Sequence, residues 1–369
     1  MKKVAFVVDK IEKVFPSKPL KGGGYLVARY LIQEFVKKDD IELYVISGKS
    51  SSVNIEGIKE LIILNSYIHT DKNIFLSDVK NFISGKFDAV LFLTFEASFE
   101  NVLLQAHTAE YKLTNGKNKL QNFFIKNLLK KQKIKENRAL FSLQNKKFFA
   151  VSEKLKLDYV KNWGLSTNSV TVVYPGVEIR SFRKKQNEIF TFAYPSGTNK
   201  NKGVIDLFFA AILLWVSGEK FKLNAILSSH NKNGFLKNLL GFFIPQSMLN
   251  IVDRQIDMLN FYSSADCVLL PSLNESFGLV PLEAAACRIP SIISNTAGVA
   301  EIFENSVDSM IYDKTKFPVL NLYESMKKML KLYNEEKENY EKLADNAFKV
   351  AQKYSWESFS NIIYAKLFE

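Results

Sequence analysis

Two glutamates in the last third of the chain have the side chains and the surroundings to bind a polar ligand. An apolar run at 265–270 predicts a buried strand, which Pro271 and Ser272 end. A helix is expected from 279 to 287, because Pro281 is tolerated only in a first turn. Glu275 would then stand on the loop after the strand, and Glu283 about one turn into the helix. Two carboxylates placed in this way suit the hydroxyl groups of a sugar or a ribose.

Backbone amides are expected between these carboxylates. The residues at this junction are Ser276, Phe277, Gly278 and Leu279. N–H groups at a helix start have no helical acceptor, and together with the helix dipole they favour an anion, most often a phosphate. An ordinary strand–turn–helix joint with two solvated acids has the same outline. The Pro-Ser before the first glutamate, the Phe-Gly after it and the alanine after the second favour a ligand site.

The stretch 271–284 resembles the E-x7-E signature of the family-4 retaining glycosyltransferases of the bacterial surface-glycan type. The resemblance covers nearly the whole chain. It implies an α/β GT-B fold, with two Rossmann-like doubly wound domains facing a central cleft and a C-terminal helix that crosses back to the N-terminal domain. It also implies that Glu275 contacts the donor sugar and that Glu283 holds the ribose of the nucleotide.

A glycine run near the N-terminus supports this resemblance. Gly22, Gly23 and Gly24 follow a short apolar strand at 3–8 and precede a helix that reaches about residue 37. Strand, glycine-rich turn and helix form a typical phosphate cradle, although the spacing is neither G-x-G-x-x-G nor a Walker loop. A flexible loop before an amphipathic helix would look the same. The resemblance implies that these glycines face the donor diphosphate and the acceptor.

A second phosphate loop is expected around Gly197, Thr198 and Lys202. Lys202-Gly203 corresponds to a Lys-Gly pair of the family, whose lysine contacts the donor diphosphate. Thr198 stands where the family has an arginine, so this chain departs from the pattern there. A cation at a helix start opposes the helix dipole, and a nearby anion would explain Lys202.

Two further candidates depend on the resemblance. It implies that His107 lies near the donor sugar and Arg254 near the nucleobase, although a capping or core role is the commoner use of a single histidine. The chain has no D-x-D motif, two cysteines and three histidines. We therefore expect no metal site, no cofactor besides the nucleotide-diphosphate sugar, and buried thiols in a reducing compartment.

Alternating strands and helices predict parallel sheets with helices on both faces. The chain has 369 residues, which suits two domains. We expect an acceptor-binding domain at 1–180, completed by a helix at 354–369, and a donor-binding domain at 188–353. Strands are expected at 3–8, 41–47, 58–64, 87–95, 102–106, 148–151, 170–174, 189–193, 223–228, 265–270 and 291–294, and helices at 204–216, 317–333 and 335–353.

Most of the net charge of +12 lies in the segment 112–147. Its basic residues are Lys112, Lys117, Lys119, Lys126, Lys130, Lys131, Lys133, Lys135, Arg138, Lys146 and Lys147, against the single acid Glu136. A basic helix with an apolar face suits an anionic membrane surface. The pattern is equally typical of a solvated helix that packs its apolar stripe on its own domain. Nucleic acid is the third reading, and we expect none because no nucleic-acid module accompanies the charge.

The sequence thus predicts a metal-independent, retaining glycosyltransferase that moves a hexosyl-type sugar from a nucleotide-diphosphate sugar. The expected acceptor is a glycan or a lipid-linked saccharide of polysaccharide or lipopolysaccharide biosynthesis. The expected location is the cytoplasm, including the inner face of the cell membrane as a peripheral protein, because neither a signal peptide nor a long apolar run occurs. Two alternatives stay open: a non-catalytic GT-B binding or scaffold subunit, and a nucleic-acid-modifying glycosyltransferase.

Overall fold

The structure is a computed structural model, and it divides into two compact units. It describes residues 1–8, 10–16, 23–48, 50, 53–65, 78–79, 81–83, 85–93, 102–105, 147–163, 165–179, 187–197, 200–227, 242–252 and 258–369. Unit 1 comprises Met1–Pro175 and Trp356–Glu369, and unit 2 comprises Gly176–Ser355. Among the described helices, none combines the length and the apolar character needed to cross a bilayer.

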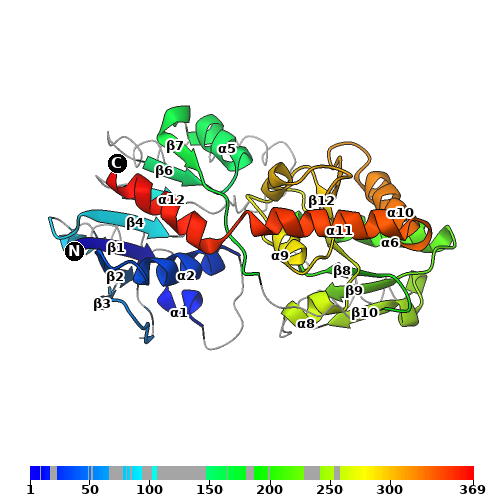
Figure 1. The fold of residues 1–369 in the computed structure, drawn as a ribbon, viewed down its shortest axis with the longest axis horizontal. Helices are drawn as coiled ribbons and strands as arrows, with labels where there is room; N and C mark the ends of the chain where they lie inside the picture. Colours follow the sequence, from blue (N-terminus) through cyan, green and yellow to red (C-terminus); the bar gives the residue numbers. More distant parts are fainter. Residues whose placement is uncertain are drawn as a thin grey trace, which may run out of the picture. The chain divides into compact units, whose positions relative to one another are not determined.

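Unit 1 is built on a parallel sheet with the order β3-β2-β1-β4-β5-β6-β7 (Figure 1). Its strands are β1 (Lys2–Val8), β2 (Ile41–Ser47), β3 (Glu60–Ile63), β4 (Ala89–Leu93), β5 (Val102–Gln105), β6 (Lys147–Ala150) and β7 (Val170–Val172). Every adjacent pair is parallel. The central strand β1 is apolar from Val4 to Val8, and all five residues there are fully buried. Such burial is typical of a parallel sheet, because helices cover both of its faces.

Helices cover this sheet, and one of them comes from the far end of the chain. The helices of unit 1 are α1 (Ile11–Val14), α2 (Gly23–Val36), α5 (Glu153–Trp163), the short 3-10 helix η1 (Thr167–Ser169) and α12 (Trp356–Phe368). The rings of Tyr30 on α2 and Trp356 on α12 stack with centroids 4.5 Å apart. Nζ of Lys2 lies 3.1 Å from the hydroxyl of Tyr364. The last helix therefore packs on the N-terminal sequence, as the GT-B resemblance predicts.

Unit 2 contains a second parallel sheet with the order β10-β9-β8-β11-β12-β13. Its strands are β8 (Thr191–Tyr194), β9 (Lys222–Ile226), β10 (Leu249–Val252), β11 (Cys267–Leu270), β12 (Ser291–Ser294) and β13 (Met310–Tyr312). Its helices are η2 (Lys200–Lys202), α6 (Val204–Val216), η3 (Gln246–Met248), α8 (Met258–Ser263), α9 (Val280–Ala286), η4 (Gly298–Ile302), α10 (Pro318–Glu335) and α11 (Lys337–Gln352).

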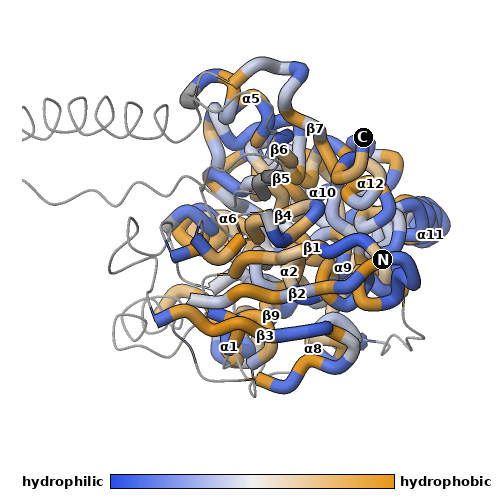
Figure 2. The backbone as a smooth tube through the Cα atoms, turned by 90° about the vertical axis from the view of Figure 1, so that its left-hand side faces the viewer, coloured by the Kyte–Doolittle hydropathy of each residue, from blue (hydrophilic) through white to orange (hydrophobic). Residues whose placement is uncertain are grey.

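One core cluster of unit 2 lies between this sheet and the helices α6 and α10, and a second includes residues of α8 and α9. Leu207, Ala211 and Leu214 on α6 are buried in one cluster with Leu322 and Met326 on α10. Figure 2 shows hydrophobic residues along much of β1 and β2 and hydrophilic residues along much of α11. The predicted doubly wound α/β architecture is confirmed in both units. Strands β10 and β13 were not expected from the sequence.

Candidate active site in unit 2

Backbone contacts with residues 297–299 fix the loop that carries Glu275. β11 ends at Leu270, and Glu275 forms an isolated parallel bridge with Ala297. The amide of Gly298 donates to the carbonyl of Glu275 at 3.1 Å, and the amide of Val299 donates to that of Phe277 at 2.8 Å. The loop is thus held by the start of η4, which limits the positions open to the Glu275 side chain.

Lys202 and Glu275 form an ion pair between Nζ and Oε2. The two side chains are 31% and 17% exposed, so the pair is partly shielded but remains accessible to a ligand. The hydroxyl of Ser272 lies 3.4 Å from the same carboxylate oxygen. The anion that the sequence requires beside Lys202 is therefore supplied, in this structure, by Glu275.

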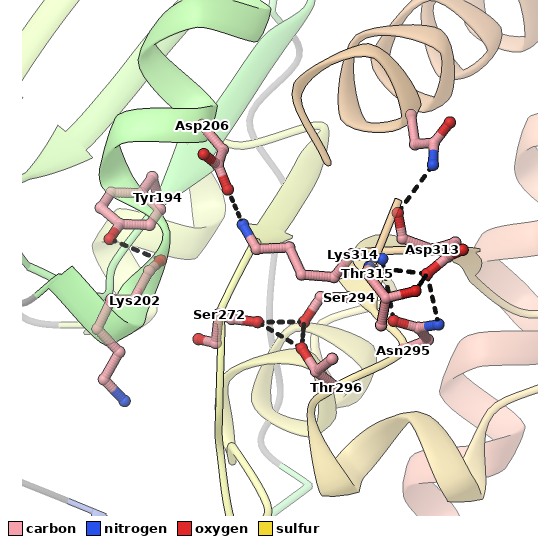
Figure 3. Close-up of polar contacts among 11 residues, drawn as sticks. Tyr194, Lys202, Asp206, Ser272, Ser294, Asn295, Thr296, Asp313, Lys314 and Thr315 are labelled. Carbon is pink, nitrogen blue, oxygen red and sulfur yellow. Dashed lines mark hydrogen bonds and ion pairs between the residues drawn. The ribbon is translucent and has the colours of Figure 1, made fainter. Parts of the chain in front are cut away.

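The turn before α6 positions Lys202. The hydroxyl of Tyr194 lies 2.6 Å from the carbonyl of Gly197 and 3.1 Å from that of Lys202 (Figure 3). Gly203 follows with φ of 70°, and a Cβ there would come within 1.8 Å of the carbonyl oxygen of Pro271. A glycine is required at this position because both the left-handed backbone and the close approach exclude a side chain. The Lys202 turn therefore abuts the start of the Glu275 loop.

Glu283 lies on α9 and contacts the phenol of Tyr262. The hydroxyl of Tyr262 donates to Oε2 of Glu283 at 2.7 Å. Part of the Glu283 side chain reaches solvent, but the packing around its carboxyl raises the pKa of Glu283 above the ordinary value of 4.5, and the hydrogen bond from Tyr262 opposes part of that rise. Tyr262 is buried, and this burial together with the nearby carboxylate raises the pKa of its phenol. The sequence did not single out Tyr262.

The expected amide cradle lies before the helix and not within it. α9 begins at Val280 and has seven residues, with Leu279 as its N-cap, so Ser276, Phe277 and Gly278 precede the helix. Gly278 has φ of 94°, and a Cβ there would lie 3.0 Å from Cγ of Glu275. Phe277 is buried, and its carbonyl accepts from the amide of Val299. The phosphate-binding role of these amides stays a prediction.

A polar network behind the site joins three loops of unit 2 (Figure 3). The hydroxyls of Ser294 and Thr296 donate to the carbonyl of Ser272 at 2.7 and 2.8 Å. Between these two residues, the side-chain oxygen of Asn295 accepts from the amide of Lys314 at 3.0 Å. Nζ of Lys314 forms an ion pair with Asp206 on α6. This network was not expected from the sequence, because its members come from segments that are far apart along the chain.

Several predicted site residues cannot be placed. Gly22, His107, Thr198, Arg254 and the segment 112–146 lie outside the described residues. Gly23 and Gly24 belong to the first turn of α2 in unit 1, whereas the Lys202–Glu275 pair belongs to unit 2. Within the described ranges, no group of three or more His, Cys, Asp or Glu residues is arranged as metal ligands would be.

Unit 2 brings together three groups that could bind a ligand. An accessible lysine can neutralise an anionic ligand, a restrained carboxylate at its side can accept from hydroxyl groups, and a buried carboxyl–phenol pair provides a second acceptor. All of them follow strands of a parallel sheet, whose carboxyl ends are the usual ligand-binding edge.

Comparison with known proteins finds a matching family model and a curated relative. Residues 179–350 match the family model for glycosyl transferases group 1. The capsular polysaccharide biosynthesis glycosyltransferase CapM of Staphylococcus aureus is 23% identical over 234 residues, an alignment that covers 58% of this chain and 60% of CapM. The chain thus spans less than two thirds of this curated relative.

Two solved structures extend the similarity over the full length. Sucrose-phosphate synthase from Thermosynechococcus elongatus superimposes with a TM-score of 0.76 at 14% identity, covering 100% of this chain and 99% of the other. Anabaena HepE in complex with UDP-glucose gives a TM-score of 0.69 at 14% identity, with coverage of 100% and 99%. The chain therefore has the GT-B fold, and its residues 179–350 match the group 1 glycosyltransferase family.

Proposed function

We propose that this protein is a retaining glycosyltransferase that transfers a hexosyl-type sugar from a nucleotide-diphosphate sugar. The observation that carries the proposal is the ion pair between Lys202 and Glu275. It places a cation suited to a diphosphate directly beside a carboxylate suited to sugar hydroxyls. A structural surface pair would not need the glycine at 203 or the backbone contacts that hold both loops together.

The proposed donor site follows from the chemistry of each group. Lys202 would bind the diphosphate and stabilise the charge that develops on it as the glycosidic bond breaks. Preorganised donors of this kind typically contribute a few kcal/mol, about 3, to transition-state stabilisation. Glu275, released from Lys202 by the diphosphate, would orient the sugar and support positive charge on its ring, while Glu283 would hold the ribose. The complex of HepE with UDP-glucose supports a nucleotide-sugar donor.

The reaction proposed here needs no dedicated carboxylate base. In a retaining transfer with front-face attack, the acceptor oxygen bonds to the sugar carbon on the face that the diphosphate leaves. The leaving phosphate oxygen accepts the proton of the acceptor hydroxyl as this bond forms. We further propose that charge neutralisation comes from side chains and amides, without a metal ion or another cofactor. We also propose donor-binding roles for His107, the glycines at 22–24, Gly197, Thr198 and Arg254.

The proposed acceptor is a glycan or a lipid-linked saccharide. Its support is the similarity to CapM, which is a capsular polysaccharide biosynthesis glycosyltransferase. Such acceptors are presented at a membrane surface, and the basic segment 112–147 would favour an anionic one, at about 1 kcal/mol for each basic residue near the lipid. Flotation with anionic and with neutral liposomes tests this part of the proposal separately.

The test of function is turnover of defined donors. Purified protein is screened by thermal shift against UDP-glucose, UDP-galactose, UDP-N-acetylglucosamine and GDP-mannose, and release of nucleoside diphosphate is then measured with and without EDTA. We expect one donor to raise the melting temperature and to be turned over at a rate that EDTA does not change. Glu275→Gln should abolish turnover, whereas Glu335→Gln, on the exposed end of α10, should leave it intact.

One observation favours a second candidate. Thr198 replaces the arginine that the family resemblance predicts, and a chain that has lost a diphosphate ligand could be a non-catalytic binding subunit. Stabilisation by a nucleotide sugar without any turnover would support that alternative. Turnover that Glu275→Gln abolishes would exclude it.

A further inference from the structure

We propose that Lys314 and Asp206 are positioning residues that set Lys202 against Glu275. This inference rests on the proposed function, because its effect is on the transfer step. Lys314 lies just after β13 and its side chain is 3% exposed, while Asp206 on the first turn of α6 is 18% exposed. Figure 3 shows the Lys314 side chain reaching from its own loop to Asp206, past Ser272 and Ser294.

Lys314 is connected to both loops of the site. At one end, its amide donates to Asn295, and the neighbours Ser294 and Thr296 hold the carbonyl of Ser272. Ser272 in turn donates to the carboxylate of Glu275. The backbone end of Lys314 is therefore tied to the loop that presents the sugar-binding carboxylate.

At its other end, Lys314 reaches the turn that presents Lys202. Asp206 follows Gly203 by three positions in α6, so an anchor on Asp206 fixes the first turn of that helix. Nζ of Lys314 would also lie 3.1 Å from a Cβ placed on Gly203, which sets it directly behind the turn. One side chain thus spans from the Glu275 loop to the Lys202 turn.

Stability alone does not account for a buried ion pair at this place. Desolvation of two charges offsets much of their attraction, and apolar replacements of similar volume are often neutral or stabilising. The buried Tyr312 interacts electrostatically with Asp206, and among the described residues its hydroxyl has no hydrogen-bond partner. The ion pair holds Nζ of Lys314 at a defined position against the carboxylate of Asp206, whereas apolar packing would allow more movement.

The experiment separates stability from positioning. Lys314→Met, Asp206→Asn and the double variant are compared with wild type by melting temperature and by kcat and KM for the best donor among UDP-glucose, UDP-galactose, UDP-N-acetylglucosamine and GDP-mannose. Arg288→Met/Asp345→Asn is the control, because that ion pair is exposed on both sides, at 58% and 55%. Each single variant should melt lower, since it leaves one buried charge unpaired.

The double variant carries the decision. We expect it to regain most of the melting temperature but to keep a kcat about tenfold below wild type, with KM changed by less than about threefold, because a small misplacement of a reacting group is costly. Adding Lys202→Ala to the double variant should cost no more than Lys202→Ala alone, since the pair acts through Lys202. The exposed control should match wild type in every measurement.

Wild-type kcat in the double variant would overturn the inference, and so would a tenfold loss that persists when Lys202 is already absent. Both results leave the proposed function standing, because they require an active wild type. If the wild type turns over none of the four donors, the proposed function falls, and this inference with it.

Discussion

Nζ of Lys202 pairs with Oε2 of Glu275 across 73 positions of sequence. Lys202 immediately precedes the N-cap of α6, where the helix dipole disfavours a cation, and the carboxylate compensates for that cost. The two residues proposed to bind different parts of a donor are thus partners of each other in the structure. A diphosphate that takes over Lys202 would release Glu275 toward the sugar, so binding at one end of the donor prepares the other.

This pairing predicts coupled effects on stability. Lys202→Met and Glu275→Gln should each lower the melting temperature, because each leaves a partly buried charge without its partner. The double variant should lose less than the sum of the two, with a coupling of about 1 kcal/mol, the range for contacting residues. Melting curves of the four proteins check this. Strictly additive losses would show that the ion pair contributes nothing to the stability of unit 2.

Substitution of Gly203 is predicted to be far more damaging than that of another left-handed glycine. Gly203→Ala places Cβ within 1.8 Å of the Pro271 carbonyl oxygen, whereas Gly218→Ala, with φ of 85°, meets nothing within 4 Å. Gly218→Ala should therefore cost only the backbone strain, about 1 kcal/mol. Gly203→Ala must also move the backbone, and it should lower both the melting temperature and donor binding. Equal losses in the two variants would contradict the close approach.

The contact between Tyr262 and Glu283 predicts a pH-dependent cost. The folded-state pKa of Glu283 is raised above 4.5, so the folded protein holds a proton that the unfolded chain has released, and stability falls as pH rises through the window between the two values. The Tyr262 hydroxyl favours the ionised carboxylate. Tyr262→Phe should therefore cost more above the folded-state pKa of Glu283 than at about pH 4, where Glu283 is largely protonated in both states.

Tyr340→Phe provides the matched control for this series. Tyr340 is buried like Tyr262, but its hydroxyl donates to the backbone carbonyl of Asp266 at 2.7 Å, an acceptor that does not titrate. Its loss should therefore be the same across the pH range. Melting temperatures from about pH 4 to pH 8 distinguish the two variants. Parallel curves would show that the Tyr262 bond does not sense the charge of Glu283.

Removal of the ring at 356 is predicted to loosen α12 from unit 1. Trp356 is buried and stacks on Tyr30 with an angle of 9° between the rings. Trp356→Ala should cost about 3–5 kcal/mol, the usual loss for a buried aromatic side chain. Ile362→Ala on the same helix, where the side chain is 46% exposed, should cost little. Limited proteolysis at the C-terminus, followed by mass analysis, measures the difference.

Much of the fold follows from local patterns. The predicted strands at 41–47 and 291–294 and the helix at 204–216 have the observed bounds, because each has a strong apolar pattern and clear ends. The strand expected at 189–193 is instead Thr191–Tyr194, since its ladder partners on β9 and β11 decide where pairing starts. β13 was missed because three residues carry too little pattern to be recognised.

Local sequence patterns predicted the site residues less completely than the strands and helices. Glu275 and Glu283 stand out because a motif surrounds them, and Lys202 because it lies at a helix start. Nothing local to Tyr262 or Lys314 indicates a role. Tyr262 bonds a residue 21 positions away and Lys314 one 108 positions away, and both contacts exist only because the sheet order brings their strands together.

Unit 1 is formed by two separate stretches of sequence, and this affects the order in which the units are completed during synthesis. Its sequence is interrupted at Pro175 and resumes at Trp356, so the whole of unit 2 is synthesised between its two parts. A nascent chain can complete unit 2 while β1 and α2 still await their last covering helix. Unit 1 is therefore completed only after unit 2 has been synthesised, and the apolar surface that α12 covers stays open to chaperones until that helix is made.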